Sequence, residues 1–364
     1  METKFDINGY LDQGIRKLIG NIIKAAFSNP RAAVYMLNMQ RTVASAQKRR
    51  DKYESEGIHV PAFLISSITE KCNLFCQGCY ARSNGICGTE ETKKQALSPA
   101  EWERIFAEAV DMGIPFSIIA GGEPLLRRDV IKVAAEQKNM IFGIFTNGTI
   151  INRDYTELFA KNPNLVPIIS MEGFGEETDK RRGNGVYEKL TSVMRQLDAG
   201  KILYGVSVTV TSENMRTVTS ARFIDNLRGS GCKSVFFVEY VPVENGTEHL
   251  ALSEADKDEL DGIIFKIKVD YPDMIFFSFP GDEKHMGGCL AAGRGFFHIN
   301  PQGEAEACPF SPYSDRNLRQ HSLREVLRSP FFEKLRRAEL VGGEHTGGCV
   351  LFERELEVKK MLGL

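Results

Sequence analysis

The chain has 364 residues, a formal net charge of −2 and a hydrophobic fraction of 42%. This length allows one large domain or two to three smaller ones, and the near-neutral charge excludes a general attraction to nucleic acid or anionic membranes. No apolar run approaches the ~20 residues of a membrane span, and the polar N-terminus does not resemble a signal peptide. We therefore expect a globular protein of the cytoplasm.

Residues 1–60 predict an N-terminal helical extension. Isoleucine and leucine recur at helical spacing over residues 15–23, and a second helix follows with Tyr35 and Met39 on its apolar side. This second helix ends in the basic residues 48–50. We expect a helical cap on the main domain with a solvated basic end. The alternative is an amphipathic element that contacts a membrane or an apolar substrate.

From residue 61 onward, short apolar runs alternate with amphipathic helices. The predicted strands cover residues 63–68, 116–120, 141–145, 165–170, 204–210 and 234–241. The clearest helix start is Ser98, with Pro99 at the first helical position and Glu101 completing a capping box. The later helices are predicted at residues 130–140, 152–161, 186–199, 215–227 and 252–269.

Six strand–helix units predict an α/β fold with a parallel sheet and right-handed crossovers. Such a sheet is a partial (β/α)6 barrel, which we assign to residues 61–250. By analogy with the complete eight-stranded barrel, its chemistry belongs at the C-terminal ends of the strands.

The composition changes after Pro280, where glycine becomes frequent. We assign residues 251–280 to a linker helix and strand, and residues 281–364 to a small C-terminal region. Within it, residues 296–308 read as a β-hairpin around a Pro-Gln-Gly turn. Because this region is too small to bury its own core, a metal staple would help it fold.

Eight cysteines are too few for a disulfide framework, and three of them lie within eight residues. Cys72, Cys76 and Cys79 stand in the segment CNLFCQGCY, directly after the first predicted strand. A zinc site favours two cysteine pairs, and a ferredoxin run needs more Cys-x-x-Cys steps. Three thiolates on a [4Fe–4S] cluster leave one iron without a protein ligand. That iron can accept the amino and carboxylate groups of S-adenosylmethionine (SAM).

The motif CxxxCxxC followed by the aromatic Tyr80 resembles the radical SAM superfamily. A zinc knuckle or free thiols are the alternatives. The resemblance implies a [4Fe–4S] cluster on Cys72, Cys76 and Cys79, with SAM as the second cofactor.

Other strand-end motifs also resemble this superfamily. Gly121, Gly122, Glu123 and Pro124 resemble its GGEP element, which implies a contact with the SAM amino group. Alone, this segment would be an ordinary turn. Asn147 follows the third strand and resembles a contact on the ribose side.

Ser170 and Arg182 have the spacing of a pair that holds the SAM carboxylate in the peptide- and sulfatase-modifying branch. Arg181 competes with Arg182 for this role, and Glu172 is a candidate ribose contact. Residues 240–243 end the sixth strand and either lie against adenine or pack in the core.

The segment from Cys289 through Gly303 to Cys308 resembles the opening motif of SPASM and twitch regions, which bind auxiliary iron–sulfur clusters. Cys349 is the expected third ligand. The later dense cysteine run of SPASM regions is missing, so we expect a single auxiliary [4Fe–4S] cluster. Its fourth position is either open or filled by a side chain from residues 282–285.

For that fourth position the candidates are Asp282, Glu283 and His285. The alternatives to an auxiliary cluster are a zinc site with a histidine, and buried free thiols. Cys87 and Cys232 are expected to be structural thiols.

The resemblance implies an oxygen-sensitive enzyme that cleaves SAM reductively to a 5′-deoxyadenosyl radical and abstracts hydrogen from a substrate. The first expectation is oxidative modification of a peptide or protein, and the second is modification of a small metabolite, cofactor or lipid. An iron–sulfur electron carrier or binding protein is the alternative of another class. Expected partners are the substrate and a low-potential donor of the flavodoxin or ferredoxin type, without nucleic acid and with at most peripheral membrane contact. The spacing indicates no catalytic acid or base.

Overall fold

A single mostly parallel sheet organises the chain in the computed structural model, which describes residues 30–83, 95–338, 340–341 and 349–364. The strand order is β7-β6-β5-β4-β3-β2-β1-β8-β9, and only the β8–β9 pair is antiparallel. The strands are β1 (Phe63–Ser67), β2 (Phe116–Ala120), β3 (Ile141–Thr146), β4 (Leu165–Ser170), β5 (Gly205–Val210), β6 (Ser234–Glu239), β7 (Ile275–Phe279), β8 (His298–Ile299) and β9 (Ala305–Glu306).

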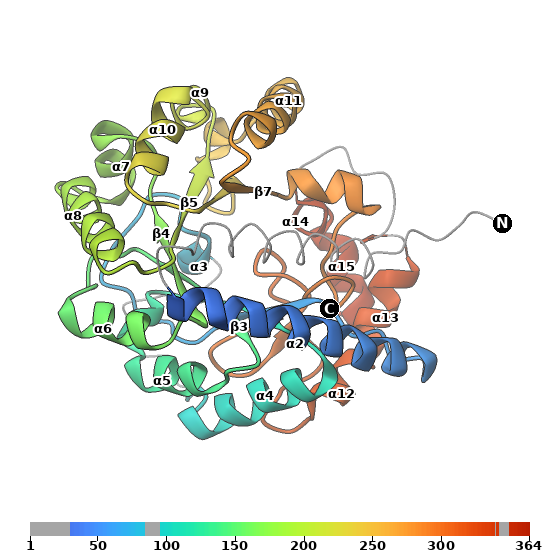
Figure 1. The fold of residues 1–364 in the computed structure, drawn as a ribbon. Coiled ribbons are helices and arrows are strands. Elements are labelled where there is room, and N and C mark those ends of the chain that lie inside the picture. The colour runs from blue at the N-terminus through green and yellow to red at the C-terminus, as the bar shows by residue number, and fades with distance from the viewer. Residues whose placement is uncertain (1–29, 84–94, 339, 342–348) are drawn as a thin grey trace.

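Helices ring the convex side of this sheet in chain order, and the C-terminal segment occupies the remaining side (Figure 1). The α-helices are α2 (Pro30–Ser55), α3 (Tyr80–Ser83), α4 (Pro99–Met112), α5 (Arg128–Glu136), α6 (Arg153–Lys161), α7 (Gly175–Arg182), α8 (Val186–Ala199), α9 (Met215–Val218), α10 (Ala221–Gly229), α11 (Glu254–Asp270), α12 (Leu323–Leu327), α13 (Pro330–Arg337), α14 (Val350–Glu353) and α15 (Glu355–Leu362). The short 3-10 helices are η2 (Pro124–Leu126), η3 (Glu248–Leu250) and η4 (Gly281–Met286). The predicted partial barrel is confirmed.

Two predicted helices differ from the structure. Helix α5 ends at Glu136 rather than residue 140, and Asn164 Nδ2 donates to the carbonyl oxygens of Ala134 (3.0 Å) and Ala135 (3.3 Å) at that end. The predicted helix over residues 215–227 is two helices, because Ser220 has extended backbone and caps the start of α10. Side-chain hydrogen bonds of this kind compete with helix continuation and are not visible in apolar periodicity.

The sheet is wider than six strands. Strand β7 pairs in parallel with β6, and β8 pairs in parallel with β1 through the partners Ile65–His298 and Ser66–Ile299. The predicted hairpin therefore exists, but its first strand extends the barrel sheet beside β1. The hairpin that precedes Cys308 therefore lies beside the strand that leads to the three-cysteine loop.

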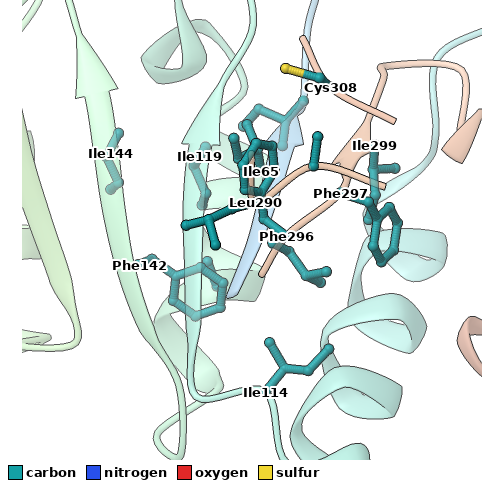
Figure 2. Close-up of a cluster of buried hydrophobic side chains, with 14 of the residues drawn as sticks. Ile65, Ile114, Ile119, Phe142, Ile144, Leu290, Phe296, Phe297, Ile299 and Cys308 are labelled. Carbon is teal, nitrogen blue, oxygen red and sulfur yellow. The ribbon is translucent and has the colours of Figure 1, made fainter. Parts of the chain in front are cut away.

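A hydrophobic cluster joins the hairpin segment to the barrel. Phe63 and Phe296 stack with their ring centroids 5.2 Å apart, and both Phe296 and Phe297 are fully buried. Figure 2 shows Leu290 and Phe296 beside Ile65, with Cys308 at the end of the cluster. Burial of this apolar surface fixes the C-terminal segment on the sheet.

Helix α2 lies across the N-terminal ends of the strands (Figure 1). Its buried residues Met39 and Val43 pack with Ile141, the first residue of β3. The predicted helical cap is confirmed for residues 30–55, whereas the pattern over residues 15–23 lies outside the described residues. No helix in the described part of the chain is long and apolar enough to span a bilayer.

The prediction of a solvated basic end to α2 is wrong for Arg50. Its side chain is 1% exposed and donates to the carbonyl oxygen of Gly113, which caps α4. A cation is favoured there because carbonyl groups at a helix C-terminus carry partial negative charge. Lys48 is exposed, as expected.

We predict that Met39→Ala destabilises the protein by about 2–4 kcal/mol, because it removes a buried side chain and leaves a cavity under the barrel. The measurement is the midpoint of thermal or urea unfolding under anaerobic conditions. Leu37→Ala, on the exposed side of the same helix, is the matched control. Equal midpoints for the two variants would contradict the packing role of α2.

Candidate active site and second cysteine group

The three-cysteine loop follows β1, and the buried side chain of Tyr240 packs against it. Gly78 has φ +64°, and a Cβ atom there would lie 2.2 Å from the Tyr240 hydroxyl. Tyr240 donates to Thr247, and the Gly78 amide donates to the Glu244 carboxylate at 2.7 Å. The predicted segment at residues 240–243 therefore begins with a residue packed on the loop. Its contact with adenine stays a prediction.

The thiols of Cys72, Cys76 and Cys79 lie close enough to influence one another electrostatically. Arg182 Nη1 is 4.0 Å from Cys76 Sγ, and Asn147 Nδ2 is 4.0 Å from Cys72 Sγ. Burial raises the pKa of Cys76, and the positive charges of Arg182 and Arg181 oppose this shift.

This donor set fits an iron–sulfur cluster. It consists of three half-buried thiols with cationic and amide N–H groups beside them, and such groups stabilise thiolates. Tyr80 begins α3, and its ring lies 5.2 Å from that of Phe310.

The GGEP segment is held against the cysteine loop by its backbone. Gly121 has φ +128°, and a Cβ atom there would lie 2.4 Å from the Thr69 carbonyl oxygen. The amides of Gly122 and Glu123 donate to the carbonyl oxygens of Thr69 and Lys71, both at 2.8 Å. These two amides therefore join the loops, and the carbonyl oxygens of the segment are left as candidates to bind the SAM amino group.

Glu123 links the ends of β2 and β3. Its fully buried carboxylate accepts hydrogen bonds from Thr146 Oγ1 (2.7 Å), the Asn147 amide (2.7 Å) and the Leu125 amide (3.0 Å). Burial raises the pKa of Glu123 to about 7, and the three hydrogen bonds oppose the shift. The side chain thus positions Asn147 from inside the protein. Pro124 opens η2 directly after it.

A buried carboxylate organises the end of β4. Glu172 is 1% exposed, and its Oε1 accepts from Arg181 Nη1 (2.5 Å) and Arg182 Nη2 (2.5 Å). Its Oε2 accepts from the Thr209 amide at 3.0 Å. Arg181 Nε also donates to the Gln77 carbonyl oxygen in the cysteine loop. Arg181 therefore clamps the loop, whereas Arg182 extends toward Cys76.

Ser170 and Arg182 do not contact each other through any hydrogen bond recorded among the described residues. Ser207 donates to Ser170 at 3.2 Å, from the neighbouring strand position in β5. Their joint role at the SAM carboxylate stays a prediction. Two arginine side chains bind the Glu172 carboxylate, so Glu172 takes part in charge pairing at the end of β4. No sequence pattern indicates a role for Ser207 or Thr209.

The three C-terminal cysteines come together from separate segments. The Cys308 thiol is hydrogen-bonded to that of Cys349, and Cys289 lies in the electrostatic field of both Cys349 and Glu283. Burial raises the pKa of Cys289 and of Cys308. Three sulfur donors from three segments fit the predicted second cluster. Cys232 is fully buried before β6, as expected, while Cys87 lies outside the described residues.

A buried chain of polar side chains, which the sequence does not predict, joins β1 to the hairpin. The fully buried His298 bonds through Nε2 to Ser67 Oγ (2.7 Å) and through Nδ1 to Glu306 Oε2 (2.6 Å). Asn300 Nδ2 donates to the other oxygen of Glu306 at 2.7 Å. With two residues, β8 is too short to indicate this arrangement from the sequence. This chain fixes the register of the hairpin beside β1.

Aromatic side chains line part of the barrel interior. Phe236 stacks on Phe277 with centroids 4.5 Å apart and meets the edge of Phe145 at 5.2 Å. All three are half-buried, while their strand neighbours Val235 and Phe276 are buried under the helices. Because Phe236 is in register with Ser207, this wall lies on the same face as the predicted SAM contacts.

Comparison with known proteins agrees with this arrangement. A family model described as the radical SAM superfamily matches residues 66–224. The AdoMet-dependent heme synthase of Methanosarcina barkeri is 24% identical over 314 residues, covering 79% of this chain and 88% of that protein. The cysteine-type anaerobic sulfatase-maturating enzyme of Clostridium novyi is 30% identical over 200 residues, half of each chain.

Among solved structures, SuiB of Streptococcus suis bound to its precursor peptide SuiA superposes with a TM-score of 0.65. The match covers 84% of this chain and 76% of SuiB at 18% identity. This likeness shows that the fold is shared.

We predict that Glu123→Gln weakens SAM binding roughly 10- to 100-fold, since a buried charged hydrogen-bond network loses about 1.5–3 kcal/mol when one acceptor becomes a donor. Equilibrium dialysis with reconstituted protein gives the affinity. Glu136→Gln, an exposed residue at the end of α5, is the control. Unchanged affinity in Glu123→Gln would refute the positioning of Asn147 by this carboxylate.

We also predict that His298→Leu lowers stability by about 1–3 kcal/mol, because Ser67 and Glu306 each lose a buried partner. Limited proteolysis and thermal unfolding measure the effect, which should be strongest in residues 281–364. The exposed His249→Ala serves as the control. A wild-type proteolysis pattern for His298→Leu would argue against hairpin anchoring by this chain.

Proposed function

We propose that this chain, which is a radical SAM enzyme, oxidatively modifies a peptide or protein by abstracting hydrogen from it. The observation that carries the proposal is the convergence of the cysteine loop, the GGEP segment and the Glu172–arginine cluster at the C-terminal ends of β1 to β4. In parallel α/β sheets this edge is where ligands bind.

Cys72, Cys76 and Cys79 would hold the SAM-binding cluster. When bound, such a [4Fe–4S] cluster supplies the electron that cleaves SAM to methionine and a 5′-deoxyadenosyl radical. The protein's own side chains hold the cysteine loop and the neighbouring charges in position. Arg181 fixes the loop through the Gln77 carbonyl oxygen, and Arg182 places positive charge beside Cys76.

SAM would be held by groups from four strand ends. The carbonyl oxygens of Gly121 and Gly122 would bind its amino group, Asn147 would bind its ribose, and Ser170 with Arg182 would bind its carboxylate. Tyr80 and Pro124 would flank the bound SAM. Glu123 and Glu172 do not need to touch SAM in this arrangement, because they orient Asn147 and the two arginines from below.

Cys289, Cys308 and Cys349 would hold an auxiliary cluster, which supplies a second redox or substrate-binding centre when bound. The proximity of their thiols supports this assignment, and β8 of the hairpin that precedes Cys308 pairs directly with the strand that leads to Cys72. A low-potential donor of the flavodoxin or ferredoxin type would deliver electrons. We place the enzyme in the cytoplasm, where these donors occur.

The peptide assignment is supported by two of the similar proteins. A sulfatase-maturating enzyme acts on a protein, and SuiB has been solved with a precursor peptide. A protein of this fold can therefore bind a polypeptide. Peripheral membrane contact gains no support from α2, whose buried side packs on the barrel.

A second candidate substrate is a planar tetrapyrrole. The half-buried stack of Phe145, Phe236 and Phe277 offers an aromatic wall to a flat apolar ring system. The heme synthase of Methanosarcina barkeri, which matches most of this chain, points to the same class.

Transfer of deuterium from substrate to 5′-deoxyadenosine separates the two candidates. We expect the reconstituted, reduced enzyme to form 5′-deoxyadenosine, and the Cys72→Ala/Cys76→Ala/Cys79→Ala variant to form none. Deuterated peptides from a proteome digest and deuterated iron-coproporphyrin are offered separately, and mass spectrometry reads the label. Label from peptides alone supports the first proposal, and label from the porphyrin alone overturns it in favour of the second.

A further inference from the structure

A buried carboxylate lies against the second cysteine group. Glu283, in η4, is 2% exposed, and its side chain is hydrogen-bonded to the thiol of Cys289. Its Oε1 also accepts from the Leu290 amide at 3.1 Å. The carboxylate is therefore directed at the segment that carries the first of the three cysteines.

The backbone around Glu283 is held in one arrangement. Its amide donates to the Pro280 carbonyl oxygen at 2.8 Å, and its own carbonyl oxygen accepts from the Gly288 amide at 3.2 Å. Arg294 then closes the loop, because its guanidinium donates to the carbonyl oxygens of Gly288 and Cys289, both at 2.8 Å. The side chain does not need to move to meet Cys289.

The charge balance of this pocket favours a metal. A buried carboxylate is costly unless it is paired with a cation or coordinates a metal ion. Arg294 is the nearby cation, but its Nη atoms are directed to backbone carbonyl oxygens, including those of Met286 and Gly287. Glu239 adds further negative potential to the pocket. Iron would supply the missing positive charge.

Its neighbours in η4 do not share this position. Asp282 is adjacent in sequence, yet its carboxylate accepts from Lys268 Nζ (2.7 Å) and from the Ser278 amide (2.9 Å). Of the two carboxylates that the sequence offered for the fourth position, only Glu283 has a recorded bond to a cysteine.

We propose that Glu283 is the fourth protein ligand of the auxiliary cluster, completing the set of Cys289, Cys308 and Cys349. This inference rests on the proposed auxiliary cluster. It makes that cluster fully protein-ligated, and its function is then electron transfer rather than direct binding of substrate. Carboxylate oxygen is an accepted, harder donor for iron than thiolate.

The test uses the full chain carrying Cys72→Ala/Cys76→Ala/Cys79→Ala, so that only the auxiliary cluster is present. This parent is labelled with 13C-glutamate, reconstituted anaerobically and reduced. Pulsed electron paramagnetic resonance should detect a 13C coupling to the cluster, and Glu283→Gln should abolish it. Asp282→Asn is the matched control and should leave it unchanged.

A second measurement adds cyanide, which binds an iron that lacks a protein ligand. We expect no spectral change in the parent and a shifted spectrum in Glu283→Gln. A parent that binds cyanide and shows no 13C coupling would overturn the assignment of Glu283. A parent without iron would instead overturn the auxiliary cluster itself. Because the 13C coupling is measured on the parent, the test stands even if Glu283→Gln fails to fold.

Discussion

The in-register parallel pairing of β1 with β2 and β8 is the constraint on which the candidate site depends. Parallel pairing brings the C-terminal ends of the strands to one edge, and the cysteine loop, the GGEP segment and the Asn147 loop follow β1, β2 and β3 there. The same β1 pairs with β8 on its other side, so the hairpin lies beside the strand that leads to Cys72. A shift of one residue would turn the interior side chains outward.

Three buried carboxylates then hold the segments of the site in position. Glu123 is satisfied by amides and a hydroxyl, Glu172 by two guanidinium groups, and Glu283 by an amide and a thiol. Glu123 and Glu172 each join the ends of different strands, whereas Glu283 binds residues of its own segment. Since an unpaired buried charge is strongly unfavourable, these partners stabilise the arrangement of the segments that carry them. The three carboxylates differ in their tasks. Glu123 positions Asn147, Glu172 places a positive charge beside Cys76, and Glu283 is the proposed cluster ligand.

Most elements could be predicted because they depend on local patterns. The capping box at Ser98 and Glu101 is present, and the short apolar runs of β2 and β4 indicated the bounds of these strands. The errors came from contacts between distant residues. Asn164 terminates α5 from another loop, and Arg50 is buried because the end of α4 offers it a carbonyl oxygen. The two-residue strands β8 and β9 are too short for periodicity to define their place in the sheet.

By itself, the sequence determined the chemistry that depends on residues close together in the chain. The order of Cys72, Cys76 and Cys79 and the glycines before Glu123 indicate a radical SAM site, because these residues act within single loops. Only the tertiary structure decided that Arg181 clamps the cysteine loop while Arg182 approaches Cys76, and that Glu283 is hydrogen-bonded to Cys289. Such choices depend on the direction of side chains across neighbouring strand ends, and chain spacing carries no information about that direction.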